Sequence, residues 1–277
     1  MLQIGKYNTL TVAREVEFGL YLADDRGTEV LLPRRYVTPE MAVGSDVTVF
    51  VYKDSDDRPV ATTERPYATV GEFAYLQVRD VNKTGAFLDW GLLKDLLVPY
   101  AEQKSRMRPG GTYLVYVYLD TVTGRIAASA RIERYLGNVL PDYRPGQEVS
   151  ALIIEHTPIG FRAIVDNLHW GMIYDSELYT PFDIEQVVTA RVKQVRPDGK
   201  IDLTMLDRTA DRVDAICRAI IRALHDSDGT LTVTDASSPD EIRLRFRCSK
   251  KDYKKALGHL YKKGRITLAK DHITLVK

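Results

Sequence analysis

The sequence has 277 residues, of which 44% are hydrophobic and 28% are charged, and its formal net charge is +1. This is ordinary globular composition with apolar residues for several small cores, and its longest apolar run is too short to cross a bilayer. The first residues lack the order of a signal peptide, and two cysteines without paired spacing support neither a disulfide framework nor a thiolate zinc site, so we expect a cytoplasmic protein.

The charge is distributed unevenly along the chain. Residues 1–66, 67–140, 141–208 and 209–277 carry net charges of −3, +2, −4 and +6. A basic C-terminal end on an otherwise balanced chain indicates a polyanionic partner that is contacted mainly there.

The chain contains an internal repeat. When the sequence is shifted by 66 positions, Gly19 aligns with Gly85 and Pro33 with Pro99, without a gap. A further shift of 75 positions gives a weaker third copy, in which Gly85 meets Gly160. Each unit is the size of a small domain rather than of a solenoid turn.

The three units read as short strands separated by turns. In the first unit we expect strands at 2–4, 9–16, 18–22, 29–32 and 47–52. In the second unit we expect them at 71–81, 85–90, 96–98, 113–119 and 126–129, with a helical turn or a loop within 99–109. The third unit runs from about 143 to 206. Such strands favour small closed barrels, because closure removes sheet edges that would pair with other chains.

After residue 207 the hydrophobic period becomes helical. We expect one helix over 213–224, a second over 239–246 capped by Ser238, and a third opened by Ser249 and Asp252 in a capping-box pattern. The apolar stripe of the third helix is Tyr253, Ala256, Leu257, Leu260 and Tyr261. Two short strands, 265–269 and 272–276, would complete a winged helix-turn-helix. The predicted domains are therefore barrels at 1–66, 67–140 and 141–208 and a winged helix at 209–277.

The repeated units resemble S1 domains, the RNA-binding variety of the OB-fold, whose hallmark is a strand beginning roughly G-A-F-V. The copies here begin at Gly19, Gly85 and, in degenerate form, Gly160. Several S1-type barrels followed by a winged helix resemble the conserved virulence factor B family of bacterial RNA-binding proteins. The resemblance covers nearly the whole chain and implies a monomeric or weakly associating, non-catalytic regulator that binds single-stranded RNA.

The resemblance also implies RNA-binding positions: an aromatic before the glycine, an aromatic two positions after it, and a histidine at the start of the helical turn. Proline or tyrosine replaces that histidine in all three units. Carried over with their neighbours, the candidates are Phe18, Tyr21, Arg34 and Arg35 in the first unit, Lys83, Phe87 and Tyr100 in the second, and Arg162, Trp170 and Tyr174 in the third. Aromatics here stack on bases of any sequence, or else fill the cleft between units.

Lysines gather on the third helix, away from its apolar stripe. The RNA-binding candidates in this domain are Lys250, Lys251, Lys254, Lys255, Lys262 and Arg265, with Arg243, Arg245 and Arg247 enriching the same end. A charge run is usually a solvated face, but a winged helix uses this helix for recognition. Lysine suits phosphates more than base edges, so we expect contacts to the nucleic-acid backbone.

The sequence gives no sign of catalysis. The five histidines are scattered, no metalloprotease or phosphate-loop motif is present, and we expect no cofactor and no metal. The acidic run 54–57 could suggest a metal-dependent nuclease, although a solvated hairpin turn explains it better. Two alternatives stay open: a DNA-binding regulator that uses the winged helix on duplex DNA with the barrels as interaction modules, and a nuclease or RNA-degradation accessory factor.

Overall fold

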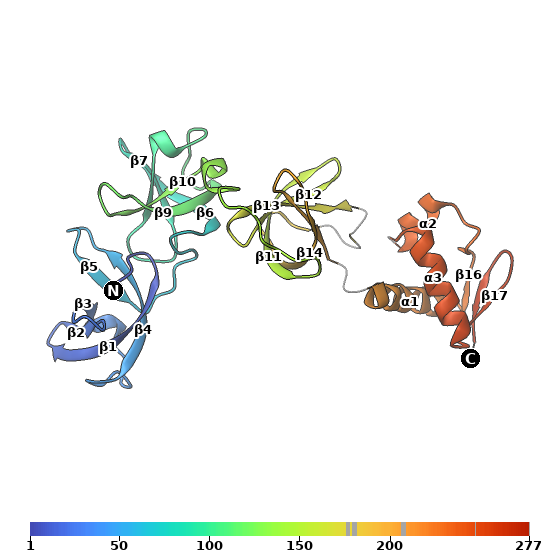
Figure 1. Cartoon of the computed structure of the whole chain (residues 1–277), viewed down its shortest axis with the longest axis horizontal. Coiled ribbons are helices and arrows are strands. Elements are labelled where there is room, and N and C mark those ends of the chain that lie inside the picture. Colours follow the sequence, from blue (N-terminus) through green and yellow to red (C-terminus); the bar gives the residue numbers. More distant parts are fainter. Residues whose placement is uncertain (176–177, 179–181, 206–208, 247, 277) are drawn as a thin grey trace. The chain divides into compact units, whose positions relative to one another are not determined.

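The computed structural model describes residues 1–175, 178, 182–205, 209–246 and 248–276. Within them the chain forms three five-stranded closed barrels and then a helical domain (Figure 1). The strands of barrel 1 are β1 (Tyr7–Val16), β2 (Gly19–Ala23), β3 (Glu29–Pro33), β4 (Asp46–Lys53) and β5 (Pro59–Thr62). Those of barrel 2 are β6 (Phe73–Val81), β7 (Gly85–Asp89), β8 (Leu96–Pro99), β9 (Thr112–Leu119) and β10 (Ile126–Ser129). Those of barrel 3 are β11 (Glu148–Thr157), β12 (Gly160–Val165), β13 (His169–Tyr174), β14 (Val187–Val195) and β15 (Ile201–Thr204).

All three barrels share one strand topology. Their orders are β1-β2-β3-β5-β4, β6-β7-β8-β10-β9 and β11-β12-β13-β15-β14, closed by pairing of the first strand with the fourth. In each barrel the third and fifth strands are parallel and the other pairs are antiparallel. This is the five-stranded arrangement of an OB-fold, as predicted. Short 3-10 turns follow the third strand of barrels 1 and 2, η1 (Arg34–Tyr36) and η2 (Tyr100–Glu102).

The repeat extends to the strand register. Gly19 faces Pro33, Gly85 faces Pro99 and Gly160 faces Tyr174, the pairs that the sequence shifts superimpose. A Cβ added at Gly85 would lie 2.2 Å from the carbonyl oxygen of Val98, and the other two glycines meet a carbonyl oxygen equally closely. Only glycine permits this approach of two strands. The repeated glycine is therefore required by the barrel itself, whether or not the barrel binds a ligand.

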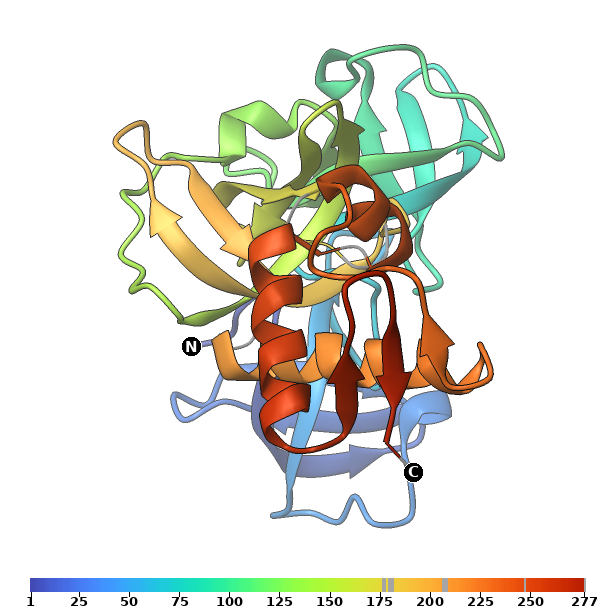
Figure 2. The ribbon, with the colours of Figure 1, turned by 90° about the vertical axis from the view of Figure 1, so that its right-hand side faces the viewer.

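The C-terminal domain has the expected three helices and a small sheet. They are α1 (Thr209–His225), α2 (Pro239–Phe246) and α3 (Lys250–Lys262), with β16 (Thr230–Leu231), β17 (Ile266–Leu268) and β18 (Ile273–Leu275) in the order β16-β18-β17. Ser249 caps α3 by accepting a hydrogen bond from the backbone N–H of Asp252. Helix α3 packs across α1 (Figure 2), and the core between them includes Ile220 and Tyr253.

Three expectations are corrected. Residues 2–4 form no strand, because Gly5 adopts a φ of +79° that ends regular extension before Tyr7. The fifth strand of barrel 1 is instead Pro59–Thr62. Tyr261 is 57% exposed rather than part of the buried stripe, since its position lies about 80° around the helix from Tyr253.

The chain divides into two compact units, Met1–Tyr135 and Leu136–Lys277. Barrels 1 and 2 form the first unit together, joined to a short turn, η3 (Ile132–Tyr135). The four domain ranges remain predictions, and the boundary at 208 lies outside the described residues. In the described part of the chain, no helix is long and apolar enough to cross a membrane.

Candidate nucleic-acid interface

Barrel 1 brings its predicted aromatics together. The exposed ring of Phe18 lies edge-on to that of Tyr21, with 6.3 Å between centroids. The guanidinium group of Arg14, directly across the strand pair, lies 3.8 Å from the centroid of Tyr21. Arg34 forms an ion pair with Glu15. The predicted pair is therefore a small exposed aromatic surface that already holds a cation on one ring.

Arg35 and Tyr100 are both engaged with neighbours in their own barrels. The guanidinium group of Arg35 lies 4.7 Å from the ring of Tyr36. The hydroxyl of Tyr100 donates to the carbonyl of Asn82, and Arg106 lies 4.1 Å from its ring. Lys83 is exposed next to this loop. Tyr100 thus has a fixed orientation, with a cation on one face.

Barrels 1 and 2 meet at a joint of polar and aromatic contacts. The ammonium of Lys94 in barrel 2 donates to the carbonyls of Lys53 and Asp54, at 3.0 and 2.7 Å. The rings of Phe50 and Trp90 meet edge to face at 5.8 Å. Phe50 is fully buried and belongs to the apolar core of barrel 2 rather than of barrel 1. Barrel 1 therefore keeps a core of its own and contributes Phe50 to the core of barrel 2.

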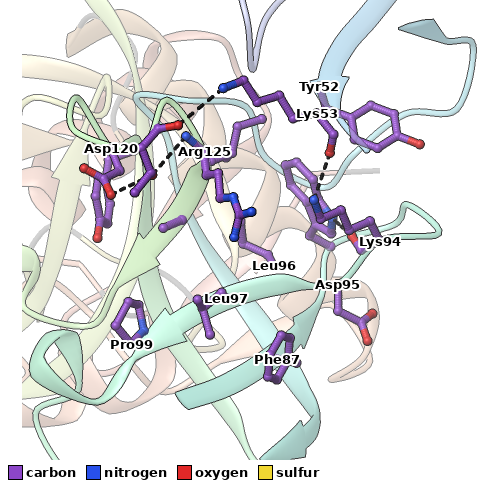
Figure 3. Close-up of a pocket in the computed structure, with 15 residues that line it drawn as sticks. Tyr52, Lys53, Phe87, Lys94, Asp95, Leu96, Leu97, Pro99, Asp120 and Arg125 are labelled. Carbon is purple, nitrogen blue, oxygen red and sulfur yellow. Dashed lines mark hydrogen bonds between the residues drawn. The ribbon is translucent and has the colours of Figure 1, made fainter. Parts of the chain in front are cut away.

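A cavity of about 250 Å³ opens at this joint, and Phe87 lines it (Figure 3). Its walls come from both barrels: Tyr52 and Lys53 of β4 on one side and strands β7 to β10 on the other. The apolar lining includes Leu97, Pro99 and Ile126. The charged lining has both signs, with Lys53, Lys94 and Arg125 beside Asp95 and Asp120. The apolar part of the cavity fits a planar aromatic group.

The three cations that line the cavity differ in how strongly neighbouring groups hold them. Arg125 is hydrogen-bonded to Asp57, whose pKa it holds below the ordinary value. Burial lowers the pKa of Lys94. The ammonium of Lys53 contacts only a backbone carbonyl, that of Thr123 at 3.3 Å, among the contacts of the described residues. Lys53 is therefore the cation best placed to meet an incoming phosphate.

Barrel 3 carries a second hollow, of about 330 Å³, on β12, β13 and the β14–β15 hairpin. The predicted residues Arg162 and Trp170 line it, with the guanidinium carbon 5.8 Å from the indole ring. Arg196 and Lys200 add two further cations. Arg162 also forms an ion pair with Glu155 at 2.9 Å.

Tyr174 lies beside this hollow rather than in it. Its hydroxyl contacts Arg196 and the carboxylate of Asp202. Burial tends to raise the pKa of Asp202, but hydrogen bonds from Arg196 and Gln194 outweigh it and lower that pKa. Tyr174 is thus part of a polar network that fixes Arg196.

The lysines of α3 fall into two groups. Lys251, Lys255 and Lys262 are exposed and lie opposite the buried stripe. By contrast, the ammonium of Lys250 donates to the carbonyl of Ser237 at 2.8 Å, and Lys254 lies 3.6 Å from the carboxylate of Asp235. The first group is therefore better placed for phosphates than the second.

The acidic run 54–57 forms a turn. The carboxylate of Asp54 accepts hydrogen bonds from the backbone N–H groups of Asp56 and Arg58, as a turn-forming aspartate does. Across the described part of the chain, no three His, Cys, Asp or Glu side chains gather as a metal site would require.

Comparison with known proteins identifies the domains. An S1 domain model matches residues 4–64 and 70–130, and a CvfB-like winged helix domain model matches 218–275. The YitL protein of Bacillus subtilis is 30% identical over 272 residues, covering 95% of this chain and 90% of that protein. Conserved virulence factor B of Staphylococcus epidermidis is 28% identical, covering 92% and 89%.

The chain belongs to the family of YitL and conserved virulence factor B. A solved multidomain protein with nucleic acid binding domains from Streptococcus pneumoniae is 24% identical, with a TM-score of 0.40 and coverage of 99% and 98%. Because S1 domains and winged helices are nucleic-acid-binding, non-catalytic kinds of domain, this member of the conserved virulence factor B family has the architecture of a nucleic-acid-binding protein.

In this member of the conserved virulence factor B family, several residues beside the predicted site were not found from the sequence. They are Arg14, Lys53, Arg125, Arg196 and Lys200. Arg14 could have been predicted from the pairing register of β1 and β2 alone, because it faces Tyr21 across this strand pair. Lys53 and Arg125 depend on how two barrels meet, which no local pattern reveals.

Proposed function

We propose that this protein binds single-stranded RNA without catalysis and regulates gene expression after transcription in the bacterial cytoplasm. One observation carries the proposal. Each barrel presents an aromatic ring near a cation: Tyr21 lies beside Arg14, Trp170 lies beside Arg162, and Phe87 of barrel 2 lines a cavity that Lys53 of barrel 1 also lines.

Ring and cation together suit an unpaired strand. Bases of a single strand are free to stack on aromatic side chains, at about 1–3 kcal/mol per base, whereas bases within a duplex are not. Neighbouring cations then neutralise phosphates, which makes binding salt-dependent. Weak contacts on several linked modules add by raising the effective concentration of each next site.

The regulatory role is supported by the relatives. The Staphylococcus epidermidis relative is named conserved virulence factor B. A protein that covers a strand without altering it would act by controlling access to that strand. This role rests on RNA binding and falls with it.

The experiment compares matched labelled single-stranded RNA, single-stranded DNA and duplex DNA by fluorescence anisotropy, using the full chain across a salt series. We expect the tightest binding to single-stranded RNA and a clear loss in Phe87→Ala. Equal or tighter binding to duplex DNA, unaffected by Phe87→Ala, would contradict the proposal.

The exposed lysines of α3 favour a second candidate, duplex DNA binding by the winged helix. In that case Lys251→Ala/Lys255→Ala would abolish duplex binding while the barrel variants leave it unchanged.

Incubation of labelled RNA with the full chain and Mg²⁺ tests a role in RNA degradation. We expect intact RNA, and metal-dependent cleavage would contradict the non-catalytic proposal.

A further inference from the structure

The winged helix carries a second basic surface, separate from the exposed lysines of α3. A groove of about 540 Å³ lies between α1 and α3 and ends at Arg265, just before β17. The thiol of Cys217 on α1 contacts the carbonyl of Ala256 on α3 at 3.5 Å, so the helices are close at its base. On one side, the groove is bounded by Arg218, Arg222 and His225 of α1. On the other, it is bounded by His259, Lys263 and Arg265.

The charge of this groove is strongly one-sided. Among the described residues that line it, four are arginine or lysine and two are histidine, against one acid, Asp214. Arg218, Arg222 and Lys263 are exposed, and no ion pair to a described residue holds any of them. Like charges held together without counter-charges destabilise a fold unless a partner neutralises them.

One polar atom in the groove lacks a partner. The Nε2 atom of His259 is buried and has no hydrogen bond to any described residue. Its nearest acid, an oxygen of Asp214, is 3.8 Å away, close enough for attraction but too far for a hydrogen bond. A buried polar atom without a partner is costly, and a turn of the partly exposed His259 ring toward a ligand oxygen in the groove would remove that cost.

The cations are spread along the groove rather than gathered at one point. Arg218, Arg222 and His225 occupy successive turns of α1. The distance along the helix axis from the first to the last of them is about 10 Å. His259 and Lys263 repeat the same spacing at the end of α3. A single compact anion would contact only part of this row, whereas a chain of phosphates would contact all of it.

We propose that the groove between α1 and α3 binds the phosphodiester backbone of a single-stranded nucleic acid. The inference rests on the proposed RNA binding and adds a specific site to it. It also assigns Arg265, predicted from sequence to act with the α3 lysines, to a different surface. His225 and His259 would donate hydrogen bonds to phosphate oxygens, and the arginines and Lys263 would neutralise charge.

The test uses the full chain and fluorescein-labelled oligouridylate RNA across a salt series. The groove variant is Arg218→Ala/Arg222→Ala/Lys263→Ala. Its control, Arg26→Ala/Arg65→Ala/Lys270→Ala, removes the same charge from exposed positions that lie outside the groove and outside the other candidate binding residues. We expect the groove variant to make the negative slope of log K against log salt shallower by about 2, at about 0.7 per lost contact, and the control to change it much less.

Two further measurements make the result decisive. Thermal unfolding of the groove variant should occur at or slightly above the temperature of the parent, because the substituted side chains are exposed and their removal relieves like-charge repulsion. Arg218→Lys/Arg222→Lys should retain most of the slope. Equal slopes in the groove variant and the control would overturn the proposal. If the parent also fails to bind RNA, the proposed function fails too; if the parent binds and Phe87→Ala weakens it, only the groove is wrong.

A parallel titration with inorganic triphosphate separates a strand from a small anion. We expect triphosphate to compete weakly with the oligonucleotide, because it reaches only part of the groove. Tight triphosphate binding by the parent, lost in the groove variant, would make the groove a site for small phosphate compounds and overturn the proposal.

Discussion

The guanidinium group of Arg125 in barrel 2 donates two hydrogen bonds to the carboxylate of Asp57 in barrel 1, at 2.6 and 2.5 Å. The two residues are 68 positions apart, and both sit in hairpin turns. With the contacts of Lys94, this pair fixes the β4–β5 hairpin of barrel 1 against barrel 2.

We expect Arg125→Gln to loosen the joint between barrels 1 and 2. Arg125 lowers the pKa of Asp57 from 3.8, so the pair stabilises the protein above that pH and the effect is lost as pH falls through the lower folded pKa. Limited proteolysis of residues 63–69 should be faster in the variant at pH 7. The difference in thermal unfolding from the parent should shrink below about pH 4. Arg58→Gln, whose partners lie in its own hairpin, is the control.

Phe87→Ala should weaken single-stranded RNA binding by about 5- to 150-fold, the equivalent of about 1–3 kcal/mol for one stacked base. Phe87 is only half-buried at the cavity rim, so the fold should persist. Anisotropy titrations measure the affinity and circular dichroism the fold. Tyr67→Ala, which removes a 67% exposed ring outside the candidate site, should bind as the parent does. Similar losses in both variants would argue against a stacking site.

The lysines of α3 should differ in their effect on salt dependence. Lys251→Ala/Lys255→Ala removes two exposed cations and should make the negative slope of log K against log salt shallower by about 1.4 for single strands. Lys250→Ala/Lys254→Ala removes the same charge, but these side chains are held by Ser237 and Asp235, so we expect a smaller change. If the two pairs behave alike, local contacts do not decide which lysines reach the phosphates.

Two substitutions, one at the N-cap of α3 and one within the helix, should change the stability of the winged helix in opposite directions. Ser249→Ala removes the cap and should destabilise the domain by about 0.5–2 kcal/mol. Gly258 lies within the helix, and an added Cβ would meet no atom within 4 Å. Gly258→Ala should therefore stabilise the domain by up to about 1 kcal/mol. Chemical denaturation of the full chain measures both, and a destabilised Gly258→Ala protein would contradict the packing described.

The sequence predicts most of the fold because its signals are local. Alternation and turns locate the barrels, and helical periodicity with Ser249 locates α3. The misplaced fifth strand of barrel 1 was recoverable: a shift of 66 positions carries 126–129 onto 60–63, which overlaps Pro59–Thr62. A strand was wrongly predicted at residues 2–4 because Leu2 and Ile4 pack against the barrel 1 core, as strand residues would, without forming a strand.

The candidate site was less accessible to sequence reasoning. Tyr21 and Phe87 follow from the repeat, and Trp170 follows from its place near Tyr174 in the third unit; RNA binding by these rings is our proposal. The cations around them come from cross-strand register and from contacts between barrels. The groove of the winged helix joins Arg218 to His259, 41 positions later, and only packing of two helices places them together.

The burial of Phe50 in the core of barrel 2 limits how this protein can be dissected. A fragment that ends at residue 66 would expose the rings of Phe50 and Tyr52 to water. A fragment that begins at residue 67 would lack these two side chains, which help to fill the core of barrel 2. Exposed aromatic patches of this kind promote aggregation. Expression trials of the N-terminal half should therefore keep residues 1–135 as one piece, and poor behaviour of either barrel alone would reflect a divided core rather than a failure to bind RNA.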